Sequence, residues 1–429
     1  MPSDARSIAE SFAAPAFLSA EERRRLKAIR VGFISGRFCF SGDGIWADAG
    51  LGRLLDALYP WCGRLTAALC QSDQPQPLLD HRLQLSPDDV LRLPDLPSIG
   101  RGFGKIASCR RVIRAVEERS DVVIVQLPFA ATLALAGARR PRVYQVCADI
   151  WAFARRSSRF AGWKRPPALI AGGLIDRLQA GLFRRGDVRV VTNGTKLRMH
   201  YGQPPGRAVI SSTILEPEIG SASRSRPADA PWRVLYVGYV RHEKGTDLLV
   251  DAFSRVLDAM PHAELEVVAG RDEAGRGMAA GFEKSLTALE KKGTVRFLGH
   301  RNFGPDLFQC FADADVLVVP SRTEGTPRVL VEARAFGCPV IGTSVGGIPT
   351  SITDGVDGLL VPPEDAPALA EAILRLARDQ PLRERLIAAG YETARRSTVE
   401  VFAAGIAEEV AALAALDVSP RPSPLAPRP

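Results

Sequence analysis

The sequence predicts an α/β protein made of two Rossmann-like domains in tandem, each with a doubly wound parallel sheet, that face each other across a cleft. Short continuous runs of Val, Ile and Leu recur along the chain, as expected of parallel strands covered by helices on both faces. Longer segments with helical spacing separate these runs, and this alternation is typical of doubly wound sheets. The length of 429 residues, 46% of them apolar, suits two domains.

The predicted strands form two series. In the first domain they are residues 29–35, 121–128, 142–148, 188–192 and 208–212, and in the second 233–237, 264–269, 295–299, 316–320, 339–342 and 358–361. Between the series, residues 216–231 are rich in Pro, Ser, Gly and Ala and predict a linker. The expected organisation is therefore an N-terminal extension (1–27), a first domain (28–215), the linker, a second domain (232–396), a terminal helix (397–417) and a disordered Pro-rich tail (418–429).

The terminal helix is predicted from apolar residues at helical spacing. These residues are Val399, Phe402, Ile406, Val410 and Leu413. Ser397 and Glu400 have the spacing of a capping box at its start.

Composition excludes several classes of protein. No apolar run approaches the roughly 18 residues that a membrane-spanning helix needs. Pro15 interrupts the apolar segment 12–18 and acidic residues precede it, so we expect no secretory signal. The seven scattered cysteines form no CxxC pair, which indicates reduced thiols in a cytoplasmic protein and no zinc site. No G-x-G-x-x-G follows the first strand, which disfavours a Rossmann oxidoreductase.

Residues 320–349, PSRTEGTPRVLVEARAFGCPVIGTSVGGIP, contain the first candidate site. A strand ends at Pro320, and a helix is expected to begin at Pro327, whose missing N–H suits the first helical position. The free amides of that first turn favour phosphate. Glu324 and Glu332 are placed to accept hydrogen bonds from different hydroxyl groups of one ligand. The alternative interpretation is one capping carboxylate and one exposed helical glutamate.

Residues 234–249, VLYVGYVRHEKGTDLL, contain the second candidate site. Arg241 and Lys244 lie on a loop between a strand and a helix, and two cations there suit a diphosphate. A solvated basic turn is the alternative interpretation.

Together these segments resemble the C-terminal domain of glycosyltransferase family 4, the retaining nucleotide-sugar transferases of GT-B fold. The resemblance is specific from about residue 233 to residue 378. It depends on the Gly-loop-Lys-Gly segment at 238–245, the E-x7-E pair at 324 and 332, and the sequences at 337–340, 346–349, 355–358 and 361–365. It implies a GT-B fold, in which we expect the C-terminal helix to cross back to the first domain.

The resemblance also implies roles for single residues. Glu324 matches the glutamate that binds hydroxyl groups of the donor sugar, Glu332 the one that binds the ribose, and Lys244 the lysine that holds the diphosphate. The backbone amides of Gly325, Thr326 and Arg328, next to Pro327, are expected to face the sugar and the phosphates. Gly238 is expected to belong to the loop that binds the donor.

Two positions depart from the family pattern. Tyr239 occupies the place of the usual phosphate-binding arginine, and Arg241 is the candidate substitute. Thr350 stands where many members have a glutamate.

The first domain offers weaker candidates. Gly42 and Gly44 follow the first strand and either approach the donor phosphates across the cleft or simply shape a loop. Asp149 follows the predicted strand 142–148 and either contacts the reacting sugar or caps a helix. His242 lies in the donor loop. The remaining histidines, His81, His200, His262 and His300, are expected to be surface or packing residues.

Basic and aromatic residues concentrate in residues 151–190. Nine Lys or Arg and only two Asp lie there, which accounts for most of the net charge of +8. The expected membrane patch comprises Arg155, Arg156, Arg159, Lys164, Arg165 and Trp163. Such a stretch suits anionic lipid, so we expect peripheral attachment to the inner face of the membrane. A solvated face is the alternative; nucleic acid is disfavoured because no recognised binding motif accompanies the charge.

The resemblance implies transfer of a hexosyl group, with retention, from a UDP- or GDP-linked sugar to a hydroxyl of a glycan or lipid-linked acceptor. The expected setting is cell-surface polysaccharide biosynthesis, and we expect neither a metal ion nor a cofactor. Two alternatives stay open: a sugar-nucleotide epimerase of related architecture, and a catalytically silent binding protein of the same fold.

Overall fold

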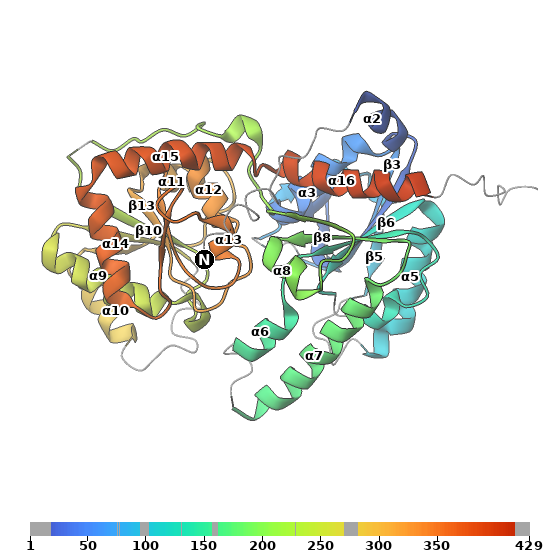
Figure 1. Ribbon diagram of the computed structural model, residues 1–429, viewed down its shortest axis with the longest axis horizontal. Helices are drawn as coiled ribbons and strands as arrows, with labels where there is room; N and C mark the ends of the chain where they lie inside the picture. The colour runs from blue at the N-terminus through green and yellow to red at the C-terminus, as the bar shows by residue number, and fades with distance from the viewer. Residues whose placement is uncertain are drawn as a thin grey trace, which may run out of the picture.

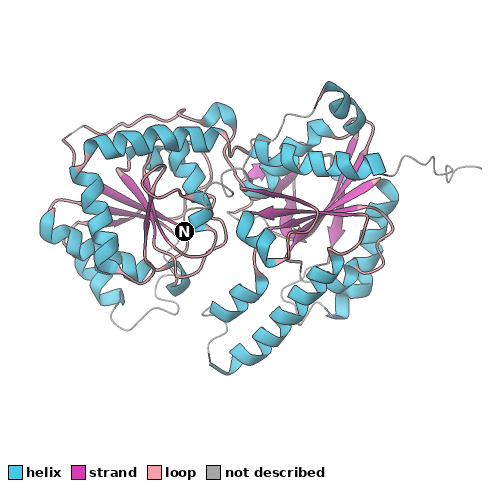
Figure 2. Ribbon diagram, in the orientation of Figure 1, coloured by secondary structure: helices cyan, strands magenta, loops and turns pink. Residues whose placement is uncertain are grey.

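A computed structural model describes residues 19–416 apart from residues 75, 77, 95–102, 130, 157–161, 228 and 270–281. It confirms two α/β domains with parallel sheets, each covered by helices (Figures 1 and 2). Most of the predicted N-terminal extension, up to residue 18, and the predicted tail at 418–429 lie outside the described residues.

The sheet of the first domain has a parallel core in the order β5-β3-β1-β6-β7-β8-β9, and the short strands β2 and β4 extend it in antiparallel fashion from the end of β1. The strands are β1 (Arg30–Ser41), β2 (Ile45–Ala47), β3 (Arg64–Ser72), β4 (His81–Arg82), β5 (Val90–Leu93), β6 (Val122–Leu127), β7 (Arg142–Val146), β8 (Val188–Asn193) and β9 (Gly206–Val209). The helices are α2 (Ala20–Leu26), α3 (Ala49–Leu58), α5 (Ile106–Arg119), α6 (Ile150–Arg156), α7 (Arg165–Leu182) and α8 (Thr195–His200). The strands at β2, β3, β4 and β5 were not predicted. The buried segment of β3 reads LTAALC, and its small residues weaken the apolar signal.

The sheet of the second domain is parallel throughout, in the order β12-β11-β10-β13-β14-β15. Each predicted strand is present: β10 (Arg233–Val237), β11 (Glu264–Val268), β12 (Val295–Phe297), β13 (Val316–Val319), β14 (Val340–Thr343) and β15 (Leu359–Val361). The helices are α9 (Thr246–Ala259), α10 (Phe282–Lys291), α11 (Pro305–Asp313), α12 (Val329–Ala335), α13 (Ile348–Ser351), α14 (Ala366–Arg378) and α15 (Gln380–Arg395). The strand order reverses between β10 and β13, and ligands of such sheets bind beyond the carboxyl ends of the strands at this point.

Helix α16 (Val399–Leu416) crosses back and packs against the first domain, as expected (Figure 1). Its five predicted apolar residues are all buried in the core formed by α3, β1 and their neighbours. At about 1.5–3 kcal/mol for each large side chain, this burial contributes roughly 10 kcal/mol in gross transfer free energy. The predicted capping box is wrong: Thr398, not Ser397, accepts the Val401 amide through Oγ1 (3.4 Å), while a Glu400 carboxylate oxygen accepts the Glu216 amide.

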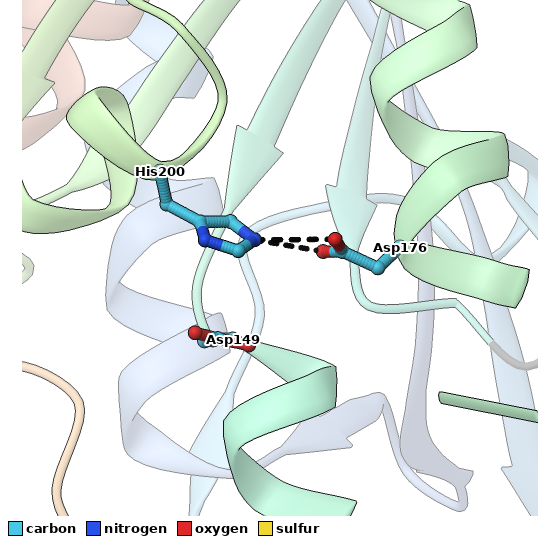
Figure 3. A group of neighbouring side chains, drawn as sticks. All are labelled: Asp149, Asp176 and His200. Atoms are coloured by element: carbon cyan, nitrogen blue, oxygen red, sulfur yellow. Dashed lines mark hydrogen bonds and ion pairs between the residues drawn. The ribbon is translucent and has the colours of Figure 1, made fainter. Parts of the chain in front are cut away.

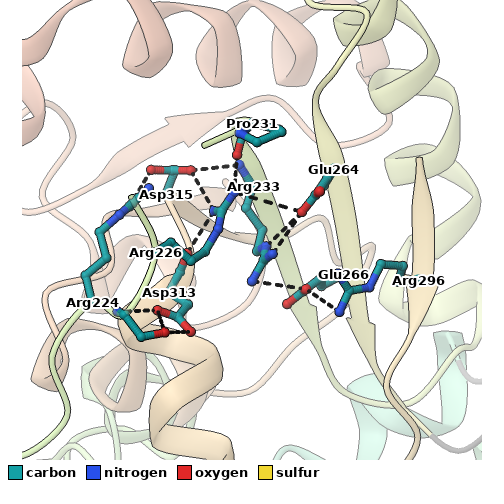
Figure 4. A network of polar contacts seen from close by, with 10 residues as sticks. Arg224, Arg226, Pro231, Arg233, Glu264, Glu266, Arg296, Asp313 and Asp315 are labelled. Carbon is teal, nitrogen blue, oxygen red and sulfur yellow. Dashed lines mark hydrogen bonds and ion pairs between the residues drawn. The ribbon is translucent and has the colours of Figure 1, made fainter. Parts of the chain in front are cut away.

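Part of the linker is fastened to the second domain by ion pairs and hydrogen bonds (Figure 4). Arg224 pairs with Asp315 (2.6 Å), and Arg226 contacts the same carboxylate (3.4 Å). The Ser225 amide and hydroxyl donate to Asp313 (2.7 and 3.0 Å). Asp313 and Asp315 have the D-x-D spacing of a metal-binding pair, but here they hold the linker.

Candidate functional site

A cavity of about 400 Å³ lies between the two domains, beside the carboxyl ends of strands from both sheets. The first domain contributes Arg37, Gly50, Gln126, Gln145, Cys147 and Asn193 to its walls. The second domain contributes Tyr236, Gly238, Tyr239, Lys244, Ser321, Glu324, Thr326, Pro327, Arg328 and Glu332. The structure therefore brings together most of the residues predicted in the second domain.

Two loops of the second domain are joined beneath this cavity. The backbone amide of Arg322 donates to the carbonyl of Glu243 (3.0 Å), which connects the loop after β13 to the loop after β10. Gly245 has φ +67°, and a Cβ there would lie 1.9 Å from the carbonyl oxygen of Pro320. Only glycine fits that contact, so Gly245 fixes the position of its neighbour Lys244.

Lys244 and Glu324 meet at the wall of the cavity. The Lys244 Nζ atom lies 2.6 Å from Glu324 Oε2, and the Ser321 hydroxyl donates to the same oxygen (3.1 Å). The side chains are 30% and 14% exposed, so both face the cavity from partly buried positions. A cation suited to phosphate thus stands next to a carboxylate suited to sugar hydroxyl groups.

The motif at 346–349 shapes the loop that carries Glu324. Gly346 has φ +60°, and a Cβ there would lie 1.8 Å from the carbonyl oxygen of Glu324. The amide of Gly347 donates to the carbonyl of Gly325 (2.7 Å). Close backbone contact thus explains why two glycines stand here.

Glu332 is buried and reaches the cavity from α12. Burial raises the pKa of Glu332, while the charge of Arg328 opposes that shift. The helix begins at Val329 and not at Pro327, because Pro327 lies in a preceding tight turn in which its carbonyl accepts the amide of Leu330 (3.4 Å).

Arg241, the predicted phosphate-binding cation, lies beside Tyr239 on the loop after β10. Its guanidinium stacks on the ring of Tyr239, with Cζ 4.4 Å from the ring centroid. Tyr239 lines the cavity, whereas Arg241 is not among the lining residues. The hydroxyl of Tyr236 donates to the carbonyl of Tyr239 (2.7 Å) and holds this loop in place.

The glycines predicted in the first domain lie elsewhere. Because β1 continues to Ser41 beyond a register shift, Gly42 and Gly44 form the turn between β1 and β2, in which the Gly42 amide donates to the Gly44 carbonyl (2.9 Å). They do not line the cavity between the domains.

Arg37 and Gly50 face the second domain instead. The Arg37 guanidinium donates to Asp48 (2.7 Å), and a Cβ on Gly50 would lie 1.7 Å from Nη1 of Arg328. Sequence reasoning missed Arg37; the signal that was present is a cation just after the predicted first strand.

Asp149 caps a helix. Its Oδ1 accepts the amide of Ala152 (2.8 Å) at the start of α6, and it is absent from the lining of the cavity. Cys147, two residues earlier, reaches the cavity, and burial raises its pKa to about 11. Its thiol is therefore protonated at neutral pH. For Asp149, the structure therefore shows the helix cap, which was one of the two roles that the sequence predicted.

The domains also touch each other next to the cavity. The hydroxyl of Thr326 donates to the carbonyl of Asn193 (3.0 Å), and Asn193 Nδ2 returns a longer bond to the Thr326 carbonyl (3.5 Å). Farther along the interface, the Phe303 amide donates to Asp80 (3.2 Å). The loop that carries Glu324 is therefore positioned from both sides.

The predicted membrane patch lies on α6, α7 and the turn Gly162–Lys164, which extend away from the first sheet (Figure 1). Trp163 is 82% exposed, with Lys164 Nζ 5.8 Å from its ring centroid. Arg155 stacks on Trp151 (4.6 Å), and Arg165 is exposed at the start of α7. Arg159 and the side chain of Arg156 lie outside the described residues. Among the helices that the structure describes, none is both long enough and apolar enough to cross a bilayer.

Two parallel-sheet domains that enclose a cleft, with a C-terminal helix returning to the first domain, define a GT-B fold. Solved structures agree with this class. Sucrose-phosphate synthase from Thermosynechococcus elongatus has a TM-score of 0.64 at 18% identity, covering 90% of this chain and 98% of that one. Anabaena HepE in complex with UDP-glucose has a TM-score of 0.63 at 19% identity, covering 90% and 100%.

The sequence of the second domain gives a closer relationship. Residues 222–393 match the family model of glycosyl transferases group 1. The D-inositol 3-phosphate glycosyltransferase of Thermomonospora curvata is 36% identical over 180 residues, which cover 40% of this chain and 41% of that protein. The enzyme of the same name from Streptomyces griseus is 34% identical over 187 residues, covering 41% and 39%. The chain thus spans about two fifths of the length of these curated relatives, and the similarity to glycosyl transferases group 1 lies in residues 222–393.

Proposed function

We propose that the protein is a glycosyltransferase that moves a sugar from a nucleoside diphosphate to an acceptor hydroxyl with retention at the anomeric carbon. The observation that carries this proposal is the contact between Lys244 and Glu324 at the wall of an interdomain cavity that Glu332 also lines. The match of residues 222–393 to glycosyl transferases group 1 supports it. Membership of family 4 is part of the proposal.

In the proposed complex, Lys244 contacts the diphosphate of a UDP- or GDP-linked sugar. Glu324 then exchanges its ion pair for hydrogen bonds to the sugar hydroxyl groups, and Glu332 accepts those of the ribose. Arg37 and Arg328 add positive charge from opposite walls of the same cavity. Negative charge on the donor is therefore met from both domains.

The reaction breaks the bond between the anomeric carbon and the phosphate oxygen. Negative charge develops on the departing nucleotide, and fixed cations stabilise it without reorganising during the step. The acceptor hydroxyl attacks from the face that the phosphate leaves, and its proton passes to that phosphate. We propose that the side chains of this chain suffice for the step and that no metal ion takes part.

The acceptor is proposed to be a glycan or lipid-linked hydroxyl in cell-surface polysaccharide biosynthesis, bound by the first domain. The exposed cations and aromatic rings of α6 and α7 support docking on an anionic membrane from the cytoplasmic side. Sedimentation with vesicles containing anionic lipid at low salt tests this. A variant with Trp163→Ser and Lys164→Ser is expected to lose binding, whereas Lys291→Ser with Lys292→Ser is expected to keep it. Failure of the unaltered protein to sediment would refute the docking.

The reaction is tested first by thermal shift with nucleoside diphosphates and their sugar conjugates. One base and one sugar should raise the melting temperature most, and release of that nucleotide should require an acceptor. Conversion of the donor to a different sugar nucleotide without an acceptor would instead establish an epimerase. No shift with any donor would favour a catalytically silent protein.

A further inference from the structure

Three potential metal ligands from separate segments converge at the base of the α6–α7 pair. Asp149 lies between β7 and α6, Asp176 lies within α7, and His200 ends α8. Figure 3 shows His200 and Asp176 facing each other with Asp149 beside them, and the ligand atoms of the three residues all lie within 4.8 Å of one another. The sequence predicts no such group, because the three residues are far apart along the chain.

Neighbouring groups hold each ligand in place. The Tyr201 hydroxyl donates to Asp176 Oδ1 (2.9 Å), and the ring of Tyr201 packs edge-on against His200, with centroids 4.7 Å apart. The amide of Ala152 donates to one oxygen of Asp149, as described above. Partners of this kind orient the ligands in metal centres, where they raise affinity for the ion.

The group concentrates negative charge. The carboxylates of Asp149 and Asp176 lie within 4.8 Å of each other and of the His200 ring. With a neutral imidazole the two carboxylates bring two negative charges into one small region. A divalent cation has the charge that matches them.

The distances within the group suit one ion. His200 Nε2 makes a hydrogen bond to Asp176, 3.0 Å from Oδ1 and 3.2 Å from Oδ2, and a bound ion would replace this contact. If two ligand atoms each lie about 2.1 Å from one ion, and the ligand–ion–ligand angle is between about 90° and 109°, the two atoms are about 3.0–3.4 Å apart. The ligand atom of Asp149 lies within 4.8 Å of both of the others.

We propose that Asp149, Asp176 and His200 bind a divalent transition-metal ion of the zinc class. The imidazole nitrogen favours such ions over Mg²⁺ and Ca²⁺, which prefer ligand sets of oxygen alone. The bound ion joins the start of α6 to α7 and α8, so it fixes α6, which carries Trp151, and α7, which follows the turn that carries Trp163. This role is structural and separate from the cavity that holds Lys244.

The test uses tag-free protein that has been treated with a chelator and then titrated with Zn²⁺ or Co²⁺. We expect a rise of several degrees in melting temperature and a visible Co²⁺ absorption band that saturates at one ion per chain. His200→Ala and Asp176→Asn should each weaken binding at least tenfold. His262→Ala, an exposed histidine in the second domain, should bind like the unaltered chain.

Absence of the absorption band at one equivalent would overturn the proposal, as would an equal melting shift in the His200→Ala protein. Because both readouts are independent of substrate, a failed donor panel leaves this result unaffected. A nucleotide-induced thermal shift that persists after chelation would show that the two sites are distinct.

Discussion

Replacing Lys244 with alanine tests the central contact of the site. The change removes the ammonium group 2.6 Å from Glu324 Oε2 and leaves the Ser321 hydroxyl as the remaining side-chain partner of that oxygen in the described contacts. If the lysine stabilises the departing diphosphate, the transition state loses its nearest fixed cation.

The two expected effects differ in size. Loss of one preorganised group that stabilises developing charge costs about 3–4 kcal/mol, or roughly 10²–10³-fold in kcat. The same ion pair contributes only about 1 kcal/mol or less to the free energy of unfolding, because the lysine is partly exposed to solvent. Turnover should therefore collapse while the melting temperature changes by a few degrees at most.

Release of the nucleoside diphosphate, measured with the donor and acceptor identified by screening, gives kcat and KM for each variant. Lys292→Ala provides the matched control, since this exposed lysine lies in the same domain. Turnover of the Lys244→Ala enzyme within fivefold of the unaltered enzyme would refute the reasoning. So would a melting temperature lowered enough to explain the lost activity by unfolding.

Three further predictions follow from the second domain. Gly346→Ala should lower turnover at least tenfold with little change in expression, because the new methyl group displaces the Glu324 carbonyl; kinetics beside circular dichroism would check this. Glu332→Gln should weaken nucleotide affinity in calorimetry yet raise the melting temperature at neutral pH. Folding raises the pKa of Glu332, so above that raised pKa the buried charge destabilises the unaltered protein and glutamine removes the penalty. As the pH falls from the folded pKa to the pKa of the unfolded carboxyl, Glu332 takes up its proton, and the advantage of the glutamine variant in melting temperature should disappear. Arg334→Met should cost about 3–5 kcal/mol in denaturant unfolding, because it leaves the Asp357 carboxylate (3.1 Å from Nη2) without its buried partner. It also removes hydrogen bonds to the carbonyls of Ser351 (2.7 Å) and Asp357 (2.9 and 3.0 Å); an unchanged midpoint would contradict this.

The sequence predicted the second domain better than the first. Its strands are buried on both faces and rich in Val, Ile and Leu, so continuous apolar runs locate them. In the first domain, β3 is equally central, but its Ala and Thr give no such signal. The length of β1 was also not predicted. This strand continues past Ile34 after a register shift, so Gly42 and Gly44 lie away from the cavity while Arg37 lines it.

Site residues that lie close together in sequence were the ones that could be predicted. Glu324 and Glu332 share a loop and a short helix, so their spacing carries information about one ligand. Asn193 and Cys147 reach the cavity from the ends of β8 and β7, and Arg37 reaches it from within β1. Only the folded arrangement of those strands places them together. The same reason hides the group of Asp149, Asp176 and His200.

The chain crosses between the two domains, here called the N-terminal and C-terminal lobes, once after Ile214 and once before Val399, and the two crossings are adjacent. The amide of Val399 donates to the carbonyl of Ile214 (2.8 Å), so the outgoing and returning segments run beside each other. Because α16 supplies one wall of the N-terminal lobe's interior, a protein shortened to end before Val399 would expose that interior to water. The C-terminal lobe, by contrast, is one uninterrupted stretch from about the start of the family match to the end of α15, so cutting the chain there would leave its sheet and covering helices whole.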